Sequence, residues 1–364
     1  MQRRHVIQGL GLGALAMAGA ACSRDQQRPA GPADSRTFNW RLVTTWPPNF
    51  PGLGTGASEF ARLVEVCSAG RLKIKVYGAN ELVPAFEVFD AVSTGTAEVG
   101  HGGAYYWKGK IESASFFSAV PFGLTAQEMN AWLYYGGGLE LWKEAYAPFG
   151  VIPAPCGNSG TQMGGWFRRE INSLDDLKGL KMRMPGIGGE VLARAGGTPV
   201  TLAGGEIFTA LETGAIDATE WIGPYNDLAF GLYKAAKYYY YPGWHEPGTT
   251  LEAIINKQAF DELPPDLRQI VLTCCRAVNE QMLAEFTARN SEALQTLVSE
   301  HGVQLRPFPA DVLRRLRELS VEVIREGAAR DPLYARVLES LQAFQAKSSA
   351  YVKVAEEAYL AARA

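Results

Sequence analysis

The stretch "GGEIFTALETGAIDATEW", residues 204–221, contains a helix pattern and a strand pattern joined by a single glycine. Residues 204–214 have apolar side chains at helical spacing and end in Gly214, a residue type that commonly terminates helices. Residues 215–221 follow at once and have the apolar character of a short buried strand. A glycine-terminated helix that leads directly into such a strand is typical of a helix-flanked α/β sheet.

The same alternation of strands and helices extends through two blocks of the chain. The first block has strand and helix patterns in the order 37–46, 57–68, 70–78, 85–95 and 97–107. The second block opens near Cys156 and continues the alternation at residues 179–186, 186–197, 198–203 and 204–221. A strand pattern at 249–260 suits the first block, and everything after Pro264 is predicted to be helical. We therefore expect a parallel sheet in each block.

The composition is that of a folded globular protein. Of the 364 residues, 47% are hydrophobic and 20% are charged. This length suits roughly two domains with a cleft between them. The formal net charge is −3 and no long basic run occurs. Nucleic acid and anionic membrane surfaces are therefore not expected as partners.

Residues 1–36 are predicted to be an export signal followed by a polar linker, which places the mature protein in the periplasm. Arg3 and Arg4 precede a mostly apolar run rich in glycine and alanine, the order of an export signal. The arginine pair fits a twin-arginine signal, and an ordinary secretion signal is the alternative. Cys22 follows "GAA" and is a candidate lipid anchor, although Gly19 stands where lipoprotein signals have leucine.

Common enzyme motifs are missing from the sequence. No Walker loop, G-x-S-x-G elbow or H-E-x-x-H motif occurs. The 5 cysteines match no zinc or redox spacing, and Cys274 and Cys275 fit the core face of a helix. Of the 4 histidines, His245 stands beside Trp244, and we expect a structural role for it.

Two glutamates stand next to tryptophans in segments that otherwise have a buried pattern. Glu220 precedes Trp221, and Glu246 follows Trp244 in "PGWHEPG", residues 242–248. An ionised carboxylate is costly to bury without a partner. From these residues alone it stays open whether the two glutamates meet, and on what.

Several longer stretches resemble the periplasmic solute-binding proteins of tripartite ATP-independent (TRAP) transporters. Within that family they are similar to the branch that binds small 2-oxo or 2-hydroxy carboxylates. The resemblance covers nearly the whole mature chain. It is carried by "WRLVTTWP" (40–47), "GNSGTQMGGWFRREI" (157–171), "SLDDLKGLKMRMPG" (173–186), "ALETGAIDATEWIGPYND" (210–227) and "YYYYPGWHEPGT" (238–249).

The resemblance implies an α/β, two-lobe periplasmic-binding-protein fold with a hinged cleft and a long C-terminal helix. Residues 37–155 plus 247–285 would form lobe I. Residues 156–246 plus 286–325 would form lobe II, and residues 326–364 the C-terminal helix.

Arg183 stands where the family places the arginine that binds the ligand carboxylate. The planar guanidinium fork accepts a carboxylate with two parallel hydrogen bonds. The alternative is a strand-edge arginine that pairs with Asp175 or Asp176. Asn158 is expected to hydrogen-bond the ligand.

In the oxo-acid branch a metal ion bridges ligand and protein. The resemblance places its ligands at Gln162, Glu220, Glu246 and the carbonyl oxygen of Trp221, whose ring would also wall the site. Such an oxygen set suits sodium or calcium, and the sequence does not choose between them.

Tyr105 and Tyr106 are expected to approach the site from the other lobe, with plain packing as the alternative. We therefore expect an extracytoplasmic solute-binding protein, not an enzyme, that delivers a pyruvate-like carboxylate to the membrane permease subunits of a TRAP transporter. An exported metal-dependent enzyme acting on a small carboxylate, or a receptor domain feeding a sensor, are the alternatives. The sequence shows no poised base or nucleophile for the enzyme, and it does not rank pyruvate, longer 2-oxo acids and lactate.

The segment from Pro332 to Arg363 has a helical pattern longer than most globular helices. The oxo-acid binders that the chain resembles pair through a helix of this kind, so a homodimer is expected. The alternative is a kinked helix that folds back on its own lobes.

Overall fold

A computed structural model describes residues 36–363 of the chain. The predictions for the export signal, the arginine pair and the lipid anchor at Cys22 lie outside the described residues. Between residues 36 and 363, no helix combines the length and the apolar character needed to cross a membrane.

The first sheet has 5 strands in the order β2-β1-β3-β10-β4. The strands are β1 (Phe38–Thr44), β2 (Leu72–Tyr77), β3 (Val99–Gly102), β4 (Val151–Asn158) and β10 (Thr250–Asn256). β1 is parallel to β2 and β3, as expected, but β10 runs antiparallel to both β3 and β4. The sheet is therefore mixed, with β10 antiparallel to both of its neighbours.

The second sheet has 6 strands in the order β11-β9-β5-β8-β6-β7. The strands are β5 (Gly165–Phe167), β6 (Lys181–Arg183), β7 (Thr198–Val200), β8 (Ala218–Thr219), β9 (Tyr238–Tyr241) and β11 (Gln304–Pro307). β6 is parallel to β7 and β8, while β5 is antiparallel to β8 and β9. Two expectations are corrected here: this sheet is mixed too, and β11 lies in a region predicted to be entirely helical.

The helices begin and end largely where the sequence indicates. The α-helices before the long C-terminal region are α1 (Leu53–Cys67), α2 (Val88–Ser93), α3 (Ala126–Tyr135), α4 (Gly138–Tyr146), α5 (Gly186–Arg194), α6 (Gly204–Thr213), α7 (Pro224–Phe230) and α8 (Lys257–Glu262). Gly214 ends α6 in the left-handed conformation, with φ of 78°, which confirms its predicted role. α1 starts at Leu53, four residues before the helix pattern predicted over residues 57–68.

Short one-turn helices connect these elements. They are 3₁₀ turns η1 (Ala85–Glu87), η2 (Ala104–Trp107), η3 (Glu112–Phe117), η4 (Ala147–Phe149), η5 (Leu174–Leu177) and η6 (Leu232–Lys234). η2 contains both tyrosines predicted for the site.

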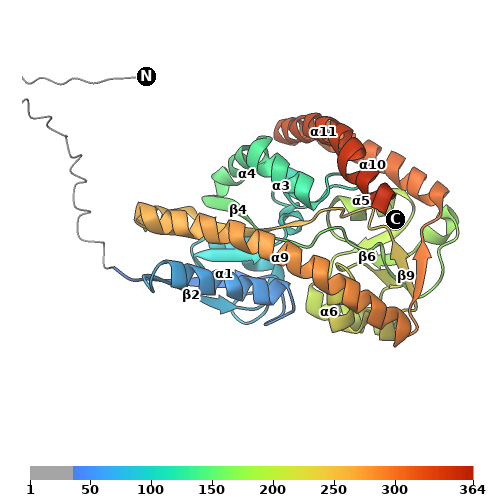
Figure 1. The fold of residues 1–364 in the computed structure, drawn as a ribbon, viewed down its shortest axis with the longest axis horizontal. Helices are drawn as coiled ribbons and strands as arrows, with labels where there is room; N and C mark the ends of the chain where they lie inside the picture. Colours follow the sequence, from blue (N-terminus) through green and yellow to red (C-terminus); the bar gives the residue numbers. More distant parts are fainter. Residues whose placement is uncertain (1–35, 364) are drawn as a thin grey trace, which may run out of the picture. The chain divides into compact units, whose positions relative to one another are not determined.

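The helix α9 (Pro265–Ser299) is 35 residues long and connects the two sheets. It packs against β4 of the first sheet and against α7, which lies between β8 and β9 of the second sheet in the chain. Figure 1 shows it crossing from the α1 side of the molecule to the α6 side. The predicted division at residue 285 falls inside this helix, and the division at residue 155 falls inside β4. Cys274 and Cys275 lie on α9 as buried free thiols, as the sequence indicates.

The C-terminal region consists of α10 (Ala310–Arg330), α11 (Pro332–Val352), a π-helical turn η7 (Lys353–Glu357) and α12 (Ala358–Arg363). α11 lies beside α3 and α4 (Figure 1) and buries Leu338 and Leu341 in the core. Beyond this contact the apolar side chains are exposed: Tyr351 by 69% and Val354 by 73%. The helical region thus folds back on its own chain as far as Ser348, which donates a hydrogen bond to Glu128, and most of the large apolar side chains beyond Ser348 are exposed.

Candidate functional site

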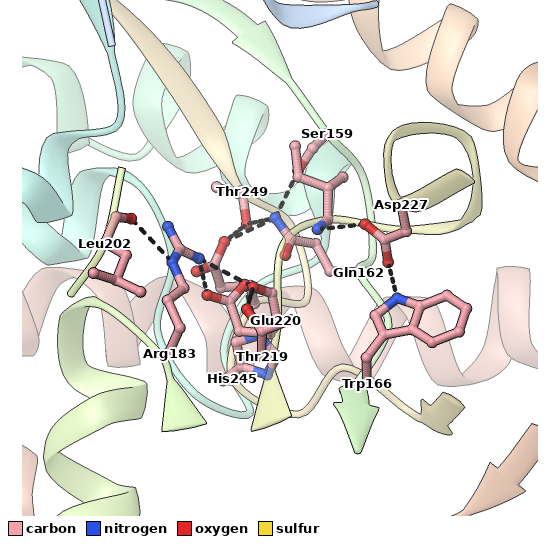
Figure 2. A network of polar contacts seen from close by, with 12 residues as sticks. Ser159, Gln162, Trp166, Arg183, Leu202, Thr219, Glu220, Asp227, His245 and Thr249 are labelled. Atoms are coloured by element: carbon pink, nitrogen blue, oxygen red, sulfur yellow. Dashed lines mark hydrogen bonds and ion pairs between the residues drawn. The ribbon is translucent and has the colours of Figure 1, made fainter. Parts of the chain in front are cut away.

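Two neighbouring strands of the second sheet place Arg183 and Glu220 side by side. Arg183 is the last residue of β6, and Glu220 directly follows β8, which runs parallel to β6 with Arg183 opposite Thr219. The carboxyl ends of parallel strands meet at one edge of a sheet, where ligands commonly bind. Arg183 Nη1 forms an ion pair with Glu220 Oε1, and each side chain is only 1% exposed (Figure 2).

The guanidinium of Arg183 is held from several sides. Its Nε donates to the carbonyl oxygen of Leu202 at 3.4 Å, and its Nη2 donates to Tyr106 Oη at 3.2 Å. It also lies 5.1 Å from the centroid of the Trp221 ring. Burial, the largest single cause, lowers the pKa of Arg183, but Glu220 and the other acidic groups around it together raise the pKa by more, so the net shift is upward. Arg183 is therefore a fixed, buried positive charge.

The alternative partners of Arg183 are engaged elsewhere. Asp175 pairs with Lys178 at 2.7 Å, and Asp176 accepts hydrogen bonds from the backbone nitrogens of Asn172 and Ser173 at 2.9 Å. The alternative that Arg183 pairs with Asp175 or Asp176 is therefore wrong, because Arg183 pairs with Glu220.

Gln162 and Glu246 form a second group that faces the first. Gln162 Nε2 donates to Glu246 Oε2 at 2.8 Å, to Ser159 Oγ at 3.0 Å and to Thr249 Oγ1 at 3.2 Å. Thr249 Oγ1 also donates to Glu246 Oε2, at 2.7 Å. Burial, and then the nearby Glu220 carboxylate, raise the pKa of Glu246 to about 7. A cation at this position would favour the ionised form of Glu246.

His245 joins these carboxylates, which the sequence did not lead us to expect. Its Nε2 lies 3.6 Å from Glu220 Oε2. One ligand atom each from Glu220, His245 and Glu246 can be chosen so that all lie within 4.8 Å of one another. The only sequence signal was that His245 directly precedes a predicted metal ligand.

The first sheet contributes aromatic side chains. Tyr105 and Tyr106 lie in η2, with ring centroids 4.6 Å apart. Trp46, which was not predicted as a site residue, makes an edge contact with Trp221, with ring centroids 6.1 Å apart. Its Nε1 donates a hydrogen bond to His101 Nδ1 at 2.8 Å. Residues that follow strands of both sheets thus enclose Arg183.

Asn158 forms hydrogen bonds to the loop that follows it and to β10. Its Oδ1 accepts from the backbone nitrogen of Gly160 at 2.8 Å, and its Nδ2 donates to Thr250 Oγ1 at 3.3 Å. Its predicted contact with a ligand stays a prediction.

A second buried network positions the segment that carries Trp221. Asp227 accepts hydrogen bonds from Trp166 Nε1 at 2.9 Å, Tyr239 Oη at 2.6 Å and the backbone nitrogen of Ile222 at 3.3 Å. Figure 2 shows the contact between Trp166 and Asp227. Burial raises the pKa of Asp227 to about 7. This network orders the backbone at Trp221 and Ile222.

The buried cluster fits a hard cation. Among residues 36–363, Gln162 Oε1 and Glu220 Oε2 are both buried without a hydrogen-bond partner. Buried oxygen acceptors are costly to leave unsatisfied. A cation such as sodium or calcium takes carboxylate and carbonyl oxygens of this kind as ligands.

Two mixed α/β sheets joined by a long helix, with an arginine and a carboxylate cluster buried where they meet, define a two-lobe solute-binding protein. The sequence pattern of one family matches residues 42–331. The chain belongs to that family, the bacterial extracellular solute-binding proteins of family 7 (DctP).

Relatives of known function or structure agree with this assignment. A monocarboxylate 2-oxoacid-binding periplasmic protein of Nostoc sp. is 42% identical over 359 residues, which is 99% of this chain and 98% of the relative. A TRAP periplasmic solute-binding protein of Pseudoalteromonas atlantica T6c, solved with bound sodium and pyruvate, is 45% identical. Its TM-score is 0.87, and the match covers 89% of this chain and 99% of that chain.

A third comparison concerns a TRAP transporter solute-binding protein of Bordetella bronchiseptica RB50. It is 37% identical with a TM-score of 0.87, and the match covers 89% of this chain and 96% of that chain. That structure is a mixed-occupancy dimer with copurified calcium and picolinate in one site. These relatives are solute-binding receptors, not enzymes.

Proposed function

We propose that this protein binds a small 2-oxo monocarboxylate of the pyruvate type, together with sodium or calcium, and delivers it to the permease subunits of a TRAP transporter. The observation that carries the proposal is the buried Arg183 beside a carboxylate cluster that has free oxygen acceptors. Relatives solved with sodium and pyruvate, or with calcium and picolinate, support it.

In this proposal Arg183 binds the ligand carboxylate. Its Nη1 now pairs with Glu220, so an arriving carboxylate would take over one part of the guanidinium fork. Tyr106, which already accepts from Arg183 Nη2, would hold the remaining part in place. Asn158 and Tyr105 are proposed as further ligand contacts.

The metal ligands would be the side-chain oxygens of Gln162, Glu220 and Glu246 and the carbonyl oxygen of Trp221. Gln162 is well oriented for this role, because its Nε2 donates to three acceptors and its Oε1 has no hydrogen-bond partner within residues 36–363. When bound, the cation supplies the positive charge that offsets these carboxylates.

Charge balance explains why ligand and cation would bind together. With ligand present, its carboxylate, Glu220 and Glu246 would face the single guanidinium of Arg183. Like charges at short distance in a buried site are strongly unfavourable. The protein should therefore bind the ionised ligand more weakly without a cation than with one.

We also propose that lobe I (37–155 plus 247–285) and lobe II (156–246 plus 286–325) close over the ligand, in a periplasm that the chain reaches through its export signal. Contacts between the lobes support closure at this site: Tyr106 with Arg183, and Trp46 with Trp221. Hinged domains of this kind commonly close around ligands.

We further propose that the protein is a homodimer through its C-terminal helix. Tyr351, Val354 and Tyr359 are 69%, 73% and 63% exposed, and all lie in the half of the helix that leaves its own core. Clustered exposed apolar side chains typically mark an interface. The dimer in the Bordetella bronchiseptica structure is consistent with this arrangement.

The proposed ligand class can be tested on the protein as purified. Gently prepared protein is denatured, and the released small molecules are identified by mass spectrometry. A thermal-shift panel then compares pyruvate, a longer 2-oxo acid and lactate with acetate, which lacks the second oxygen donor. The proposal expects a 2-oxo monocarboxylate in the released pool and a larger shift with 2-oxo acids than with acetate. Equal shifts for all four would contradict it.

A further inference from the structure

The imidazole of His245 is buried, and neither of its nitrogens forms a hydrogen bond within the described fold. The side chain is 2% exposed, and within residues 36–363 neither Nδ1 nor Nε2 has a hydrogen-bond partner. A buried polar group without a partner costs free energy, and such groups are rare in folded proteins. Something other than the described residues is therefore expected to bind one of these nitrogens.

The position of His245 is fixed by packing. Its ring makes an edge contact with Trp244, with centroids 5.5 Å apart. On the other side α5 approaches so closely that a Cβ at Gly188 would lie 2.9 Å from His245 Cβ. Glycine at residue 188 thus permits the close approach, and the ring has little room to turn away.

The neighbours of His245 complete a mixed set of possible metal ligands. Its Nε2 is 3.6 Å from Glu220 Oε2, and ligand atoms of Glu220, His245 and Glu246 lie within 4.8 Å of one another. Bonds of about 2.0–2.2 Å from nitrogen and oxygen to one ion allow ligand atoms up to about 4.4 Å apart. A small inward movement would bring all of them onto one metal.

The distance does not fit a simple hydrogen bond between His245 and Glu220. At 3.6 Å it is longer than a hydrogen bond between nitrogen and oxygen. Glu220 Oε1 is occupied by Arg183, which leaves Oε2 directed at the same space as the imidazole. An ion bound between the two side chains would give a partner to Glu220 Oε2 and to one nitrogen of His245, which both lack a hydrogen-bond partner within residues 36–363.

We propose that His245 is an additional metal ligand, and that through it the site also binds a borderline divalent cation such as Zn²⁺. Sodium and calcium select oxygen ligands, whereas imidazole nitrogen suits zinc, copper, iron and nickel. This inference rests on the proposed function, which gives the location of the metal. It adds His245 to the metal ligands and borderline divalent cations to the metals that the site binds.

The test compares metals in protein that carries no histidine tag. All variants share a Cys67→Ser background, because Cys67 is an exposed thiol that could bind zinc on its own. Chelator-treated protein is titrated with Zn²⁺ by competition with a chromogenic chelator, and with Ca²⁺ plus pyruvate by calorimetry. His245→Leu is compared with the parent and with His301→Leu, whose imidazole stacks on Tyr233 at 3.9 Å.

We expect His245→Leu to weaken Zn²⁺ binding by at least about tenfold, the scale seen when metal-site residues are lost. Zn²⁺ affinity should fall by a larger factor than pyruvate affinity in Ca²⁺, because calcium takes oxygen ligands, and His301→Leu should match the parent in both titrations. Parent protein that does not bind Zn²⁺, or a His245→Leu variant that binds Zn²⁺ as tightly as the parent, would overturn the inference. Failure of the proposed function would show separately, as parent protein that does not bind pyruvate in Na⁺ or Ca²⁺.

A second measurement avoids substitution altogether. Nitrogen-15 spectra of histidine-labelled parent protein should show one imidazole that moves to a metal-bound shift with Zn²⁺ and stays in place with Ca²⁺. Spectra without such a change would overturn the inference even if His245→Leu fails to fold.

Discussion

Replacing Arg183 with methionine removes the fixed positive charge of the site while keeping most of the volume of the side chain. Arg183 and Glu220 are each 1% exposed. Among the described residues, no other ion pair formed by an Arg or Lys side chain joins two charges that are buried to this extent. Removing one partner of a buried pair costs about 3–5 kcal/mol. If the ligand carboxylate depends on the same guanidinium, its affinity should fall by roughly two to four orders of magnitude.

The assay is calorimetric titration with pyruvate in calcium buffer. Arg183→Met also leaves Glu220 unpaired, so the thermal unfolding of the variant is measured beside its pyruvate affinity, which separates lost stability from lost binding. Arg194→Met is the matched control, since Arg194 pairs with Glu326 at 2.6 Å on the exposed surface. A folded Arg183→Met protein that binds pyruvate within about threefold of the parent affinity (about 0.7 kcal/mol) would refute the assignment.

Two further predictions concern the helix and the core. Light scattering should show that Tyr351→Lys combined with Val354→Glu converts the dimer into a monomer. Tyr135→Lys, which changes a side chain that is 92% exposed outside the C-terminal helix, should leave the dimer intact. Parent protein that is monomeric at high micromolar concentration would exclude the dimer. Burial raises the pKa of Glu252 from 4.5 to about 8, so the native state holds a proton that the unfolded chain loses. The free energy of unfolding should therefore fall as pH rises from about 5 to about 7.5, by up to about 1.4 kcal/mol per unit, and Glu252→Gln should reduce this slope. An unchanged slope would assign the pH dependence to other groups.

The helix ends and strand positions that depend on local sequence could be predicted. Gly214 terminates α6 because glycine accepts the left-handed conformation there. The pairing of Arg183 with Glu220 was not predicted, and it arises because two parallel strands end at one sheet edge. Strand direction could not be predicted, because strands as short as β5 carry no signal of which neighbour they join. β11 forms for a similar reason: its four residues pair with the free edge of β9.

The residues missed at the site are those whose role depends on distant parts of the chain. Trp46 contacts Trp221 only because two lobes meet there. His245 looked structural beside Trp244, and only the fold shows that its nitrogens face Glu220 and find no partner among the described residues. Sequence patterns report local structure well, and they do not report which buried groups remain unsatisfied.

The central claim is that cation and carboxylate bind as a pair to the cluster of Arg183, Glu220 and Glu246. The most direct measurement is a calorimetric pyruvate titration in rigorously metal-free, sodium-free buffer, repeated with Na⁺ or Ca²⁺ restored, and the reverse titration of Ca²⁺ with and without pyruvate. The account predicts little or no pyruvate binding without a cation. It also predicts that pyruvate raises the affinity for Ca²⁺ by the same factor by which Ca²⁺ raises the affinity for pyruvate. Pyruvate affinity that is unchanged by either cation would contradict it.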